Sequence, residues 1–376
     1  MRIGIDARML DEGLGIGRYI AKLLSHLEAI QSDDTFVVFL TKKNWNTYQP
    51  KTSRFVKVLA HVHWYTFAEQ FVMPLHYLVQ RLDLVHIPHI NAPLLYPGRF
   101  VMTIHDLILV KHPLSATSAA STRHPLTHRI KYACYRFTLA CAVRRASHII
   151  TVTEVVKNDI VTIFGRSKHD ISVTSEGADP LPNATVCTEL QRFTNTRFFF
   201  RAGNAYPHKN VEGLLVAFGR LHLEYPHILL LLCGQDDFFQ KRIAALIKTM
   251  DLADVVFHLG SVSDACLAWL YAHAYAYVFP SFEEGFGLPA VEAFLQGCPV
   301  LAADIPVLRE VCGSAALYFN PGSSDDIMAA MKNVLNDPAI RPSLIRAGNE
   351  RSGQFSWDRL AKETMFVYTR FSQRHQ

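Results

Sequence analysis

Several common signatures of metal and nucleotide chemistry are missing from this chain of 376 residues. It has no Asp-x-Asp pair, which excludes one widespread metal-binding pair of carboxylates, and no Gly-Lys-Ser or Gly-Lys-Thr of a P-loop. None of the seven cysteines has a partner at the two-residue spacing of a zinc or redox motif. We therefore expect no resident metal, and cysteines that are reduced and buried.

Long apolar segments are missing as well. No run approaches the length of a membrane-spanning helix, and the charges of Arg2 and Asp6 interrupt the apolar region that a secretory signal needs. We expect a cytoplasmic protein, with the inner face of the membrane as the place for any peripheral contact.

The chain does have enough apolar sequence for two globular cores, with 49% hydrophobic and 19% charged residues. Short β-rich runs alternate with longer helical patterns, which is typical of a parallel sheet with crossover helices. The predicted strands are 2–6, 35–40, 55–60, 84–87, 101–105, 148–153 and 171–174, then 198–202, 228–233, 255–259, 275–279, 300–303 and 316–319.

A polar stretch with two prolines, from Gly177 to Thr188, interrupts this alternation. We predict an α/β protein of two doubly wound Rossmann-like domains, residues 1–178 and 197–355, with a linker over 179–196 and a C-terminal helix within 356–376. Ligands of such sheets bind at the carboxyl ends of the strands, so two facing domains would hold a site in the cleft between them.

The most informative segment runs from Ser281 to Glu292 and reads Ser-Phe-Glu-Glu-Gly-Phe-Gly-Leu-Pro-Ala-Val-Glu. Its two glycines let the backbone approach a ligand, and Pro289 suits the first residue of a helix whose free N–H groups bind anions. Glu284 and Glu292 could accept hydrogen bonds from hydroxyls at the two ends of a nucleotide sugar. Taken singly, Glu292 could instead complement the helix dipole, and Glu284 could be a solvated loop residue.

Taken whole, the segment resembles the acidic signature of the retaining glycosyltransferases of family 4, which have the two-domain GT-B fold. The resemblance implies that Glu284 holds the donor hexose and Glu292 the nucleotide ribose. It also implies a C-terminal helix that crosses back to the first domain. The donor-binding segment between the two glutamates would be Gly285, Phe286, Gly287 and Leu288.

Two candidate sites lie in the first half. Gly15 and Gly17 belong to a glycine stretch that opens the first helix, but Arg18 stands where a dinucleotide fingerprint needs its third glycine. A plain glycine turn is equally compatible with the sequence; the resemblance favours a loop facing the donor phosphates and acceptor. His105 ends a predicted strand and could simply bond a neighbouring loop, whereas the resemblance places it beside the transferred sugar.

The second half adds a cation and a base-binding stretch. Lys209 stands between a strand and a helix start, like other phosphate-binding lysines, and the resemblance directs it at the diphosphate. Asn204 stands where the family often has Arg, which puts a second cationic clamp in doubt. Val262 resembles the family's base-binding stretch, and Asp264 could accept from the N1–H and amino groups of guanine. Asp264 would equally suit the first turn of a helix.

Acidic residues are absent between Asp106 and Glu154, where seven basic residues fall: Lys111, Arg123, Arg129, Lys131, Arg136, Arg144 and Arg145. Residues 1–180 hold 21 Lys or Arg against 14 Asp or Glu, a balance of +7 within a net charge of +5. A solvated helix face is one interpretation. We prefer a docking surface in residues 107–153 for anionic membrane or a lipid-diphosphate acceptor.

These motifs predict a metal-independent retaining glycosyltransferase that moves a hexose to a glycan or lipid-linked glycan in cell-surface polysaccharide synthesis. The string from Tyr206 to Asn210 is similar to that of bacterial mannosyltransferases, which points to GDP-mannose as co-substrate and to no other cofactor. No nucleic-acid partner is expected. Two alternatives remain: an NAD-dependent oxidoreductase, which the glycine spacing disfavours, and a nucleotide-sugar-binding protein without turnover.

Overall fold

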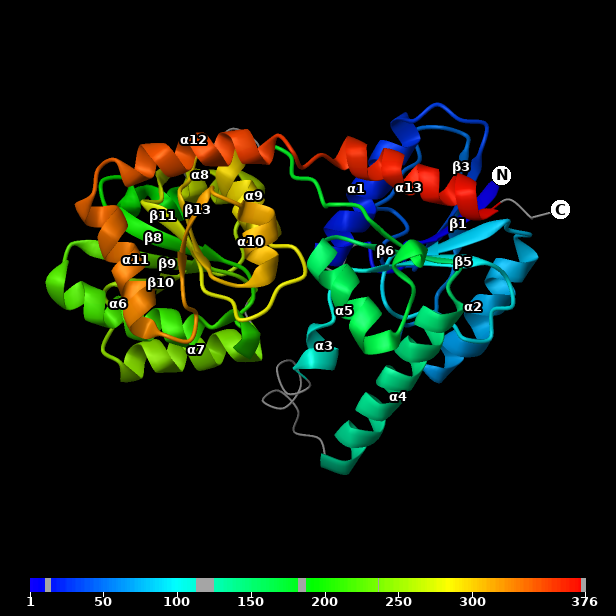
Figure 1. The fold of residues 1–376 in the computed structure, drawn as a ribbon, viewed down its shortest axis with the longest axis horizontal. Helices are drawn as coiled ribbons and strands as arrows, with labels where there is room; N and C mark the ends of the chain where they lie inside the picture. Colours follow the sequence, from blue (N-terminus) through cyan, green and yellow to red (C-terminus); the bar gives the residue numbers. More distant parts are fainter. Residues whose placement is uncertain (11–14, 113–124, 182–186, 236, 373–376) are drawn as a thin grey trace. The chain divides into compact units, whose positions relative to one another are not determined.

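The protein consists of two compact units, each with its own sheet, in a computed structural model (Figure 1). The structure describes residues 1–10, 15–112, 125–181, 187–235 and 237–372, with the backbone alone at 125–128 and 189. As far as they are described, residues 1–110, 123–177 and 356–376 form the first unit, and residues 111–122 and 178–355 form the second.

The first unit is built on a seven-stranded parallel sheet with the order β3-β2-β1-β4-β5-β6-β7. Its strands are β1 (Arg2–Asp6), β2 (Thr35–Leu40), β3 (Phe55–Leu59), β4 (Leu84–Ile87), β5 (Phe100–Ile104), β6 (His148–Thr151) and β7 (Ile171–Val173). Its helices are α1 (Gly15–Ala29), α2 (Phe67–Val79), α3 (Ile108–Lys111), α4 (Pro125–Arg145), α5 (Glu154–Phe164), the 3₁₀ turn η1 (Lys168–Asp170) and α13 (Trp357–Ser372).

Helices cover both faces of this sheet. Apolar side chains of α2, α4 and α5 join those of the strands in one buried core, while α13 packs against α1 on the other side (Figure 1). The hydroxyl of Tyr368 on α13 lies 2.6 Å from Nδ1 of His86 on β4, so the last helix of the chain is fixed to the first sheet. The predicted helix that begins at Trp357 is confirmed.

The second unit has a six-stranded parallel sheet with the order β10-β9-β8-β11-β12-β13. Its strands are β8 (Arg197–Ala202), β9 (Ile228–Cys233), β10 (Val256–His258), β11 (Ala276–Phe279), β12 (Val300–Ala303) and β13 (Ala316–Phe319). Its helices are η2 (Thr188–Phe193), η3 (Pro207–Lys209), α6 (Val211–Glu224), α7 (Phe238–Thr249), α8 (Asp264–His273), α9 (Leu288–Leu295), α10 (Pro306–Cys312), α11 (Ser324–Asn336) and α12 (Ile340–Ser352).

Each sheet reverses its winding once, and this reversal determines where a ligand can bind. The order changes direction between β1 and β4 in the first unit and between β8 and β11 in the second. The connections that leave two such strands diverge to opposite faces of the sheet, which opens a crevice at the carboxyl ends of the strands. The loops after β8 and β11 are therefore the first place to look for a site in the second unit.

Every predicted strand is present, and its ends agree with the prediction within two residues. The run predicted to end at residue 153 stops at Thr151, because Thr153 is the N-cap of α5 and its side chain accepts from the backbone N–H of Val156. The α/β fold of two doubly wound domains is confirmed. In the described part of the chain, no helix combines the length and apolar character that a membrane crossing requires.

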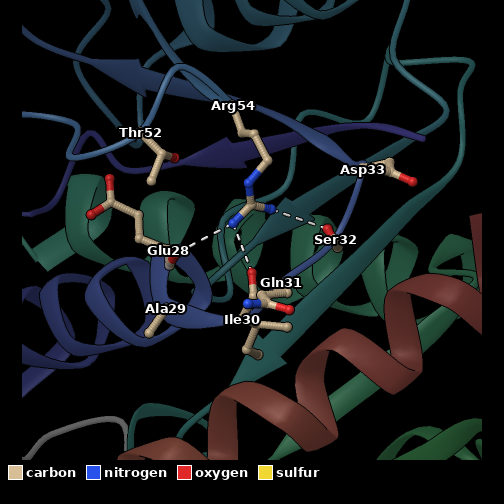
Figure 2. Close-up of a pocket in the computed structure, with 8 residues that line it drawn as sticks. All are labelled: Glu28, Ala29, Ile30, Gln31, Ser32, Asp33, Thr52 and Arg54. Atoms are coloured by element: carbon tan, nitrogen blue, oxygen red, sulfur yellow. Dashed lines mark hydrogen bonds between the residues drawn. The ribbon is translucent and has the colours of Figure 1, made fainter.

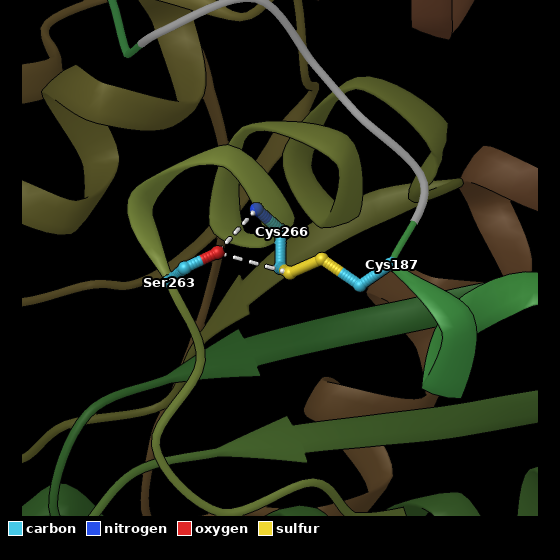
Figure 3. Close-up of a disulfide and its surroundings, with 3 residues drawn as sticks. All are labelled: Cys187, Ser263 and Cys266. Atoms are coloured by element: carbon cyan, nitrogen blue, oxygen red, sulfur yellow. Dashed lines mark hydrogen bonds between the residues drawn. A yellow bond between two sulfur atoms is a disulfide. The ribbon is translucent and has the colours of Figure 1, made fainter.

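The prediction that all cysteines are reduced is wrong for two of them. Cys187, just before η2, forms a disulfide with Cys266 on α8 (Figure 3). The two cysteines are 79 residues apart, and a pairing at that separation leaves no pattern in the spacing of cysteines along the sequence. Among the others, Cys233, Cys298 and Cys312 are free and buried, while Cys134 is exposed and Cys141 half-buried.

Candidate donor-binding site

Two loops of the second unit, one after β8 and one after β11, are fastened together by hydrogen bonds. Asn210 adopts the left-handed conformation with φ of 52°, and its side-chain amide donates to the carbonyls of Pro280 (3.1 Å) and Pro321 (2.8 Å). The backbone N–H of Phe282 donates to the carbonyl of His208 at 2.8 Å. These bonds fix the position of Lys209 relative to the acidic segment at the switch point of the sheet.

Lys209 and Glu284 form an ion pair there. The Lys209 ammonium Nζ donates to both carboxylate oxygens of Glu284, at 2.7 Å and 2.8 Å. Glu284 is buried, with 8% of its surface exposed, so it is not the solvated loop residue that one interpretation of the sequence allowed. The cation predicted for the diphosphate and the carboxylate predicted for the hexose are thus direct partners.

The start of α9 follows this pair. Gly287 is the N-cap with φ of 103°, and a Cβ at that position would lie 2.8 Å from Cδ2 of Leu308. Glycine is therefore required both by the backbone conformation and by the space. The helix begins at Leu288, which makes Pro289 its second residue. Pro289 has no N–H, and the Ala290 N–H donates to the carbonyl of Gly287 at 2.9 Å, so an anion at this turn would meet the N–H groups of Gly287 and Leu288. The geometry suits a phosphate group.

Glu292, one turn into α9, is also buried, with 6% of its surface exposed. The hydroxyl of Tyr271 on α8 donates to its Oε2 at 3.3 Å. Burial, together with the charge of Glu292, raises the pKa of Tyr271 well above its usual range, so the phenol keeps its proton and remains a donor. Tyr271 was not predicted, because a tyrosine within a helical pattern gives no sequence signal of its own.

Three buried polar atoms around the pair have no hydrogen-bond partner among the described residues. They are Oγ of Ser281, Oδ1 of Asn204 and Nδ1 of His208. Burial and the charge of Lys209 lower the pKa of His208 to about 4, so its ring is neutral at physiological pH. Since buried polar groups are nearly always satisfied, a cluster of such atoms beside an ion pair favours a ligand-binding role.

Arg201, which sequence reasoning missed, lies beneath the loop after β8. Its guanidinium is buried and donates to the backbone carbonyls of Gly203 and Asn204. Burial lowers its pKa from the ordinary value for arginine. Asn204 itself supplies no second cation. The guanidinium of Arg201 lies close to it, but its hydrogen bonds hold the loop.

The predicted base-binding stretch sits at the start of α8. Ser263 is the N-cap, its Oγ accepting from the backbone N–H of Cys266 at 3.3 Å, and Asp264 is the first helical residue. The structural role that the sequence allowed for Asp264, in the first turn of a helix, is therefore confirmed. Asp264 is also exposed, and the disulfide at Cys266 ties this turn to residue 187 (Figure 3).

In the first unit, His105 follows β5 and is held between two acceptors. Its Nδ1 lies 3.1 Å from Oε1 of Glu176, and its Nε2 lies 3.1 Å from the carbonyl of Pro88. Because both partners accept, both ring nitrogens must donate, which describes an imidazolium. Although burial disfavours the charge, the bond and charge of Glu176 outweigh it and raise the pKa of His105. Glu176 was not predicted; a Glu after a short strand is too common to stand out.

The predicted glycine loop is described only in part. Gly15 and Gly17 form the first turn of α1, as expected for residues that open the helix, while residues 11–14 lie outside the described residues. A hollow of about 540 Å³ at the other end of α1 is lined by Glu28, Ile30, Ser32 and Arg54, among others (Figure 2). There the Arg54 guanidinium donates to the carbonyls of Glu28 and Ile30. This hollow is a capped helix end and brings no predicted site residue together.

The chain has two Rossmann-like units, and the second carries a cation and carboxylates at its switch point. This two-domain architecture is the GT-B fold. Solved structures of that class superimpose on the chain. Sucrose-phosphate synthase from Thermosynechococcus elongatus does so with a TM-score of 0.75 at 19% identity, over 98% of both chains. WaaG, a glycosyltransferase involved in lipopolysaccharide biosynthesis, does so with a TM-score of 0.71 at 14% identity, over 98% of this chain and all of the other.

Sequence comparison gives the family. The model "Glycosyltransferase Family 4" matches residues 14–180, and "Glycosyl transferases group 1" matches residues 188–351. O-antigen chain mannosyltransferase B of Escherichia coli is 30% identical over 72% of this chain and 70% of its own. O-antigen chain mannosyltransferase RfbU of Salmonella typhimurium is 27% identical over 87% and 89%. The chain belongs to the family 4 glycosyltransferases.

Proposed function

We propose that this glycosyltransferase is retaining and metal-independent, and that it transfers mannose from GDP-mannose to a glycan or lipid-linked glycan of the cell surface. The observation that carries the proposal is the Lys209–Glu284 pair at the switch point of the second sheet. It sets a phosphate-binding cation and a hydroxyl-binding carboxylate side by side, which is what a sugar diphosphate requires. The mannosyltransferases among the relatives support the choice of sugar.

Each site residue has one role in this proposal. Glu284 accepts hydrogen bonds from the hexose hydroxyls, and Glu292, with Tyr271 fixing its orientation, accepts from the ribose hydroxyls. Lys209 and the backbone N–H groups at Gly287 and Leu288 stabilise the charge that grows on the departing diphosphate.

The reaction takes place on one face of the sugar. As the bond from the anomeric carbon to the phosphate oxygen breaks, the acceptor hydroxyl attacks from the same face and gives its proton to the departing phosphate. His105 supports the transferred sugar. Configuration is retained without a covalent intermediate.

Incubation with GDP-mannose, and with other nucleotide sugars in parallel, tests the activity. We expect GDP release and mannosylated product with the α configuration of the donor, at a rate that chelators leave unchanged. A product of inverted configuration, or activity that EDTA abolishes and manganese restores, contradicts the proposal.

The choice of guanine depends on Asp264. One carboxylate can accept from both N1–H and the amino group of guanine, and two charge-assisted bonds of about 1.5–3 kcal/mol each can give more than a tenfold preference over uracil. Asp264 lies exposed at the start of α8, which is compatible with this contact. In competitive binding of GDP and UDP we expect wild type to prefer GDP and Asp264→Asn to lose most of that preference. A wild type that prefers UDP ends the hypothesis.

The basic segment is a candidate surface for the acceptor side. Arg129, Arg136 and Arg144 are exposed on α4, a helix of 21 residues, which supports a contact between residues 107–153 and either anionic membrane or a lipid diphosphate. Each such cation contributes about 1 kcal/mol near an anionic surface.

A further inference from the structure

Helix α2 exposes an apolar stripe that the site does not use. Phe67, Phe71 and Leu75 are 86%, 62% and 61% exposed, and Leu78 and Val79 continue the row. Spacings of four, four and three residues place the first four on one side of the helix. The other side carries buried Met73 and Tyr77. A run of large apolar side chains this exposed marks an interaction surface.

Helix α2, which carries the stripe, shares its core with the basic helix α4. Both helices contribute to the same buried core, and both contact Tyr96: the ring of Tyr77 lies 5.1 Å from it, and the guanidinium of Arg145 donates to its carbonyl at 2.5 Å. The outer surface of α4 continues the pattern, with Ile130 56% and Phe137 66% exposed next to Arg129 and Arg136.

Negative charge is nearly absent from this part of the chain. The one acidic residue of α2, Glu69, is buried beside Arg8, with which it forms an ion pair. From there to Asp106 the sequence has a single acidic residue, Asp83, and from Asp106 to Glu154 it has none. Asp83 accepts from the backbone N–H of Arg2 at 2.7 Å, at the start of the sheet.

We propose that α2 inserts its apolar stripe into the interfacial region of an anionic lipid bilayer, while α4 supplies the cations that attract it. Apolar side chains beside lysine and arginine are the pattern of a helix that lies in the membrane surface. The inference rests on the basic docking surface proposed above and adds a second element and a second force to it, and it holds whatever sugar the enzyme transfers.

The other candidate occupant, a second copy of the chain, fits less well. In a two-fold dimer the same surface is used by both copies, so the two α4 helices would come near each other across the contact. Their exposed arginines would repel, with no acidic residue of the segment to compensate. An anionic bilayer complements both the charge and the apolar stripe.

Vesicle sedimentation with full-length protein tests the proposal. The probes are vesicles of phosphatidylcholine with phosphatidylglycerol and vesicles of phosphatidylcholine alone. The main variant is Phe67→Ser with Phe71→Ser, both highly exposed. The matched control is Phe366→Ser, a residue 67% exposed on α13, on the opposite side of the same sheet (Figure 1).

We expect the wild type to bind the anionic vesicles and to keep part of that binding at high salt, because apolar insertion is not screened. The double variant should bind at least about tenfold more weakly and lose the salt-resistant part, whereas Phe366→Ser should bind like wild type. Arg129→Gln with Arg136→Gln should lose mainly the salt-sensitive part.

Three results would overturn the proposal: no binding of wild type to the anionic vesicles, equal binding by the double variant, or an equal loss in Phe366→Ser. Light scattering in the same buffers can give a fourth contradicting result: wild type forms a dimer and the double variant is a monomer. Donor hydrolysis by the two phenylalanine variants, Phe67→Ser with Phe71→Ser and Phe366→Ser, should match wild type, which separates this proposal from the assignment of the enzyme's activity.

Discussion

At the scale of single residues, the pairing of Lys209 with Glu284 changes what each substitution should do. The ammonium donates to both oxygens of the carboxylate, so removing the carboxylate leaves the cation available to phosphate. Glu292 receives the hydroxyl of Tyr271 and lies one turn inside α9. The two glutamates should therefore fail in different ways.

We predict that Glu284→Gln binds free GDP as tightly as wild type or more tightly, yet turns over on the order of 10²-fold more slowly. Glu292→Gln should instead weaken GDP binding. Calorimetric titration with GDP, together with initial rates, measures both effects. Equal losses of GDP affinity in the two variants would show that the roles are not separate.

The His105–Glu176 pair gives a pH dependence. The hydrogen bond to Glu176 raises the pKa of His105 above the usual value of about 6.5. The stabilisation that the pair provides is therefore fully present below about pH 6.5 and is lost as the pH rises through the raised pKa. Asp106, His86, His89 and Tyr19 also face or influence the ring, and of these the Tyr19 phenol also responds to the charge of Glu176.

We predict that Glu176→Gln moves the alkaline limb of the activity profile to lower pH, because the imidazolium loses the anion that stabilises it. An NMR titration of the His105 ring should show the same shift directly. A profile and a titration that match wild type would remove Glu176 from its positioning role.

At the scale of the elements, the alternation of apolar runs was enough to predict the strands, and residue types at their ends were enough to predict the candidates. Lys209 and Glu284 were each found this way, but 75 residues separate them, and nothing in one sequence says that they touch. That contact depends on Asn210 and on the backbone of Phe282, which fasten two loops. Sequence patterns identify local structure; they do not give such pairings.

The same limit explains the disulfide and the buried partners. Arg201, Tyr271 and Glu176 belong to ordinary strand, helix and loop patterns, and only the packing of the sheet shows that they support site residues. The sequence also does not reveal that the apolar stripe of α2 is exposed. Its helical spacing alone predicts a buried face.

The disulfide supplies a prediction at this scale. Thiol titration of the unfolded, non-reduced protein should find five free thiols rather than seven. Cys187→Ser should lower the free energy of unfolding by about 2–4 kcal/mol, since the bond closes a long loop. Seven titratable thiols without reductant, or an unchanged denaturation midpoint in the variant, would contradict the assignment.

At the scale of the whole molecule, the two units divide the predicted site residues. His105, Gly15 and Gly17 belong to the first, and the lysine, the glutamates and the base-binding stretch belong to the second. Apart from the glycine loop at Gly15 and Gly17, the groups assigned to the nucleotide diphosphate lie in the second unit. Donor recognition should therefore respond to changes there, and membrane binding to changes on α2 and α4 of the first unit.

The measurement that tests the central claim most directly is thermal stabilisation by GDP-mannose of wild type, Lys209→Ala and a control, Lys241→Ala, which removes an exposed lysine on α7. A donor at about 100 times its dissociation constant stabilises a protein by about 2.7 kcal/mol. The account predicts that stabilisation for wild type and for Lys241→Ala, and its loss for Lys209→Ala at the same concentration. Failure of every nucleotide sugar to stabilise wild type, or full stabilisation of Lys209→Ala, would contradict it.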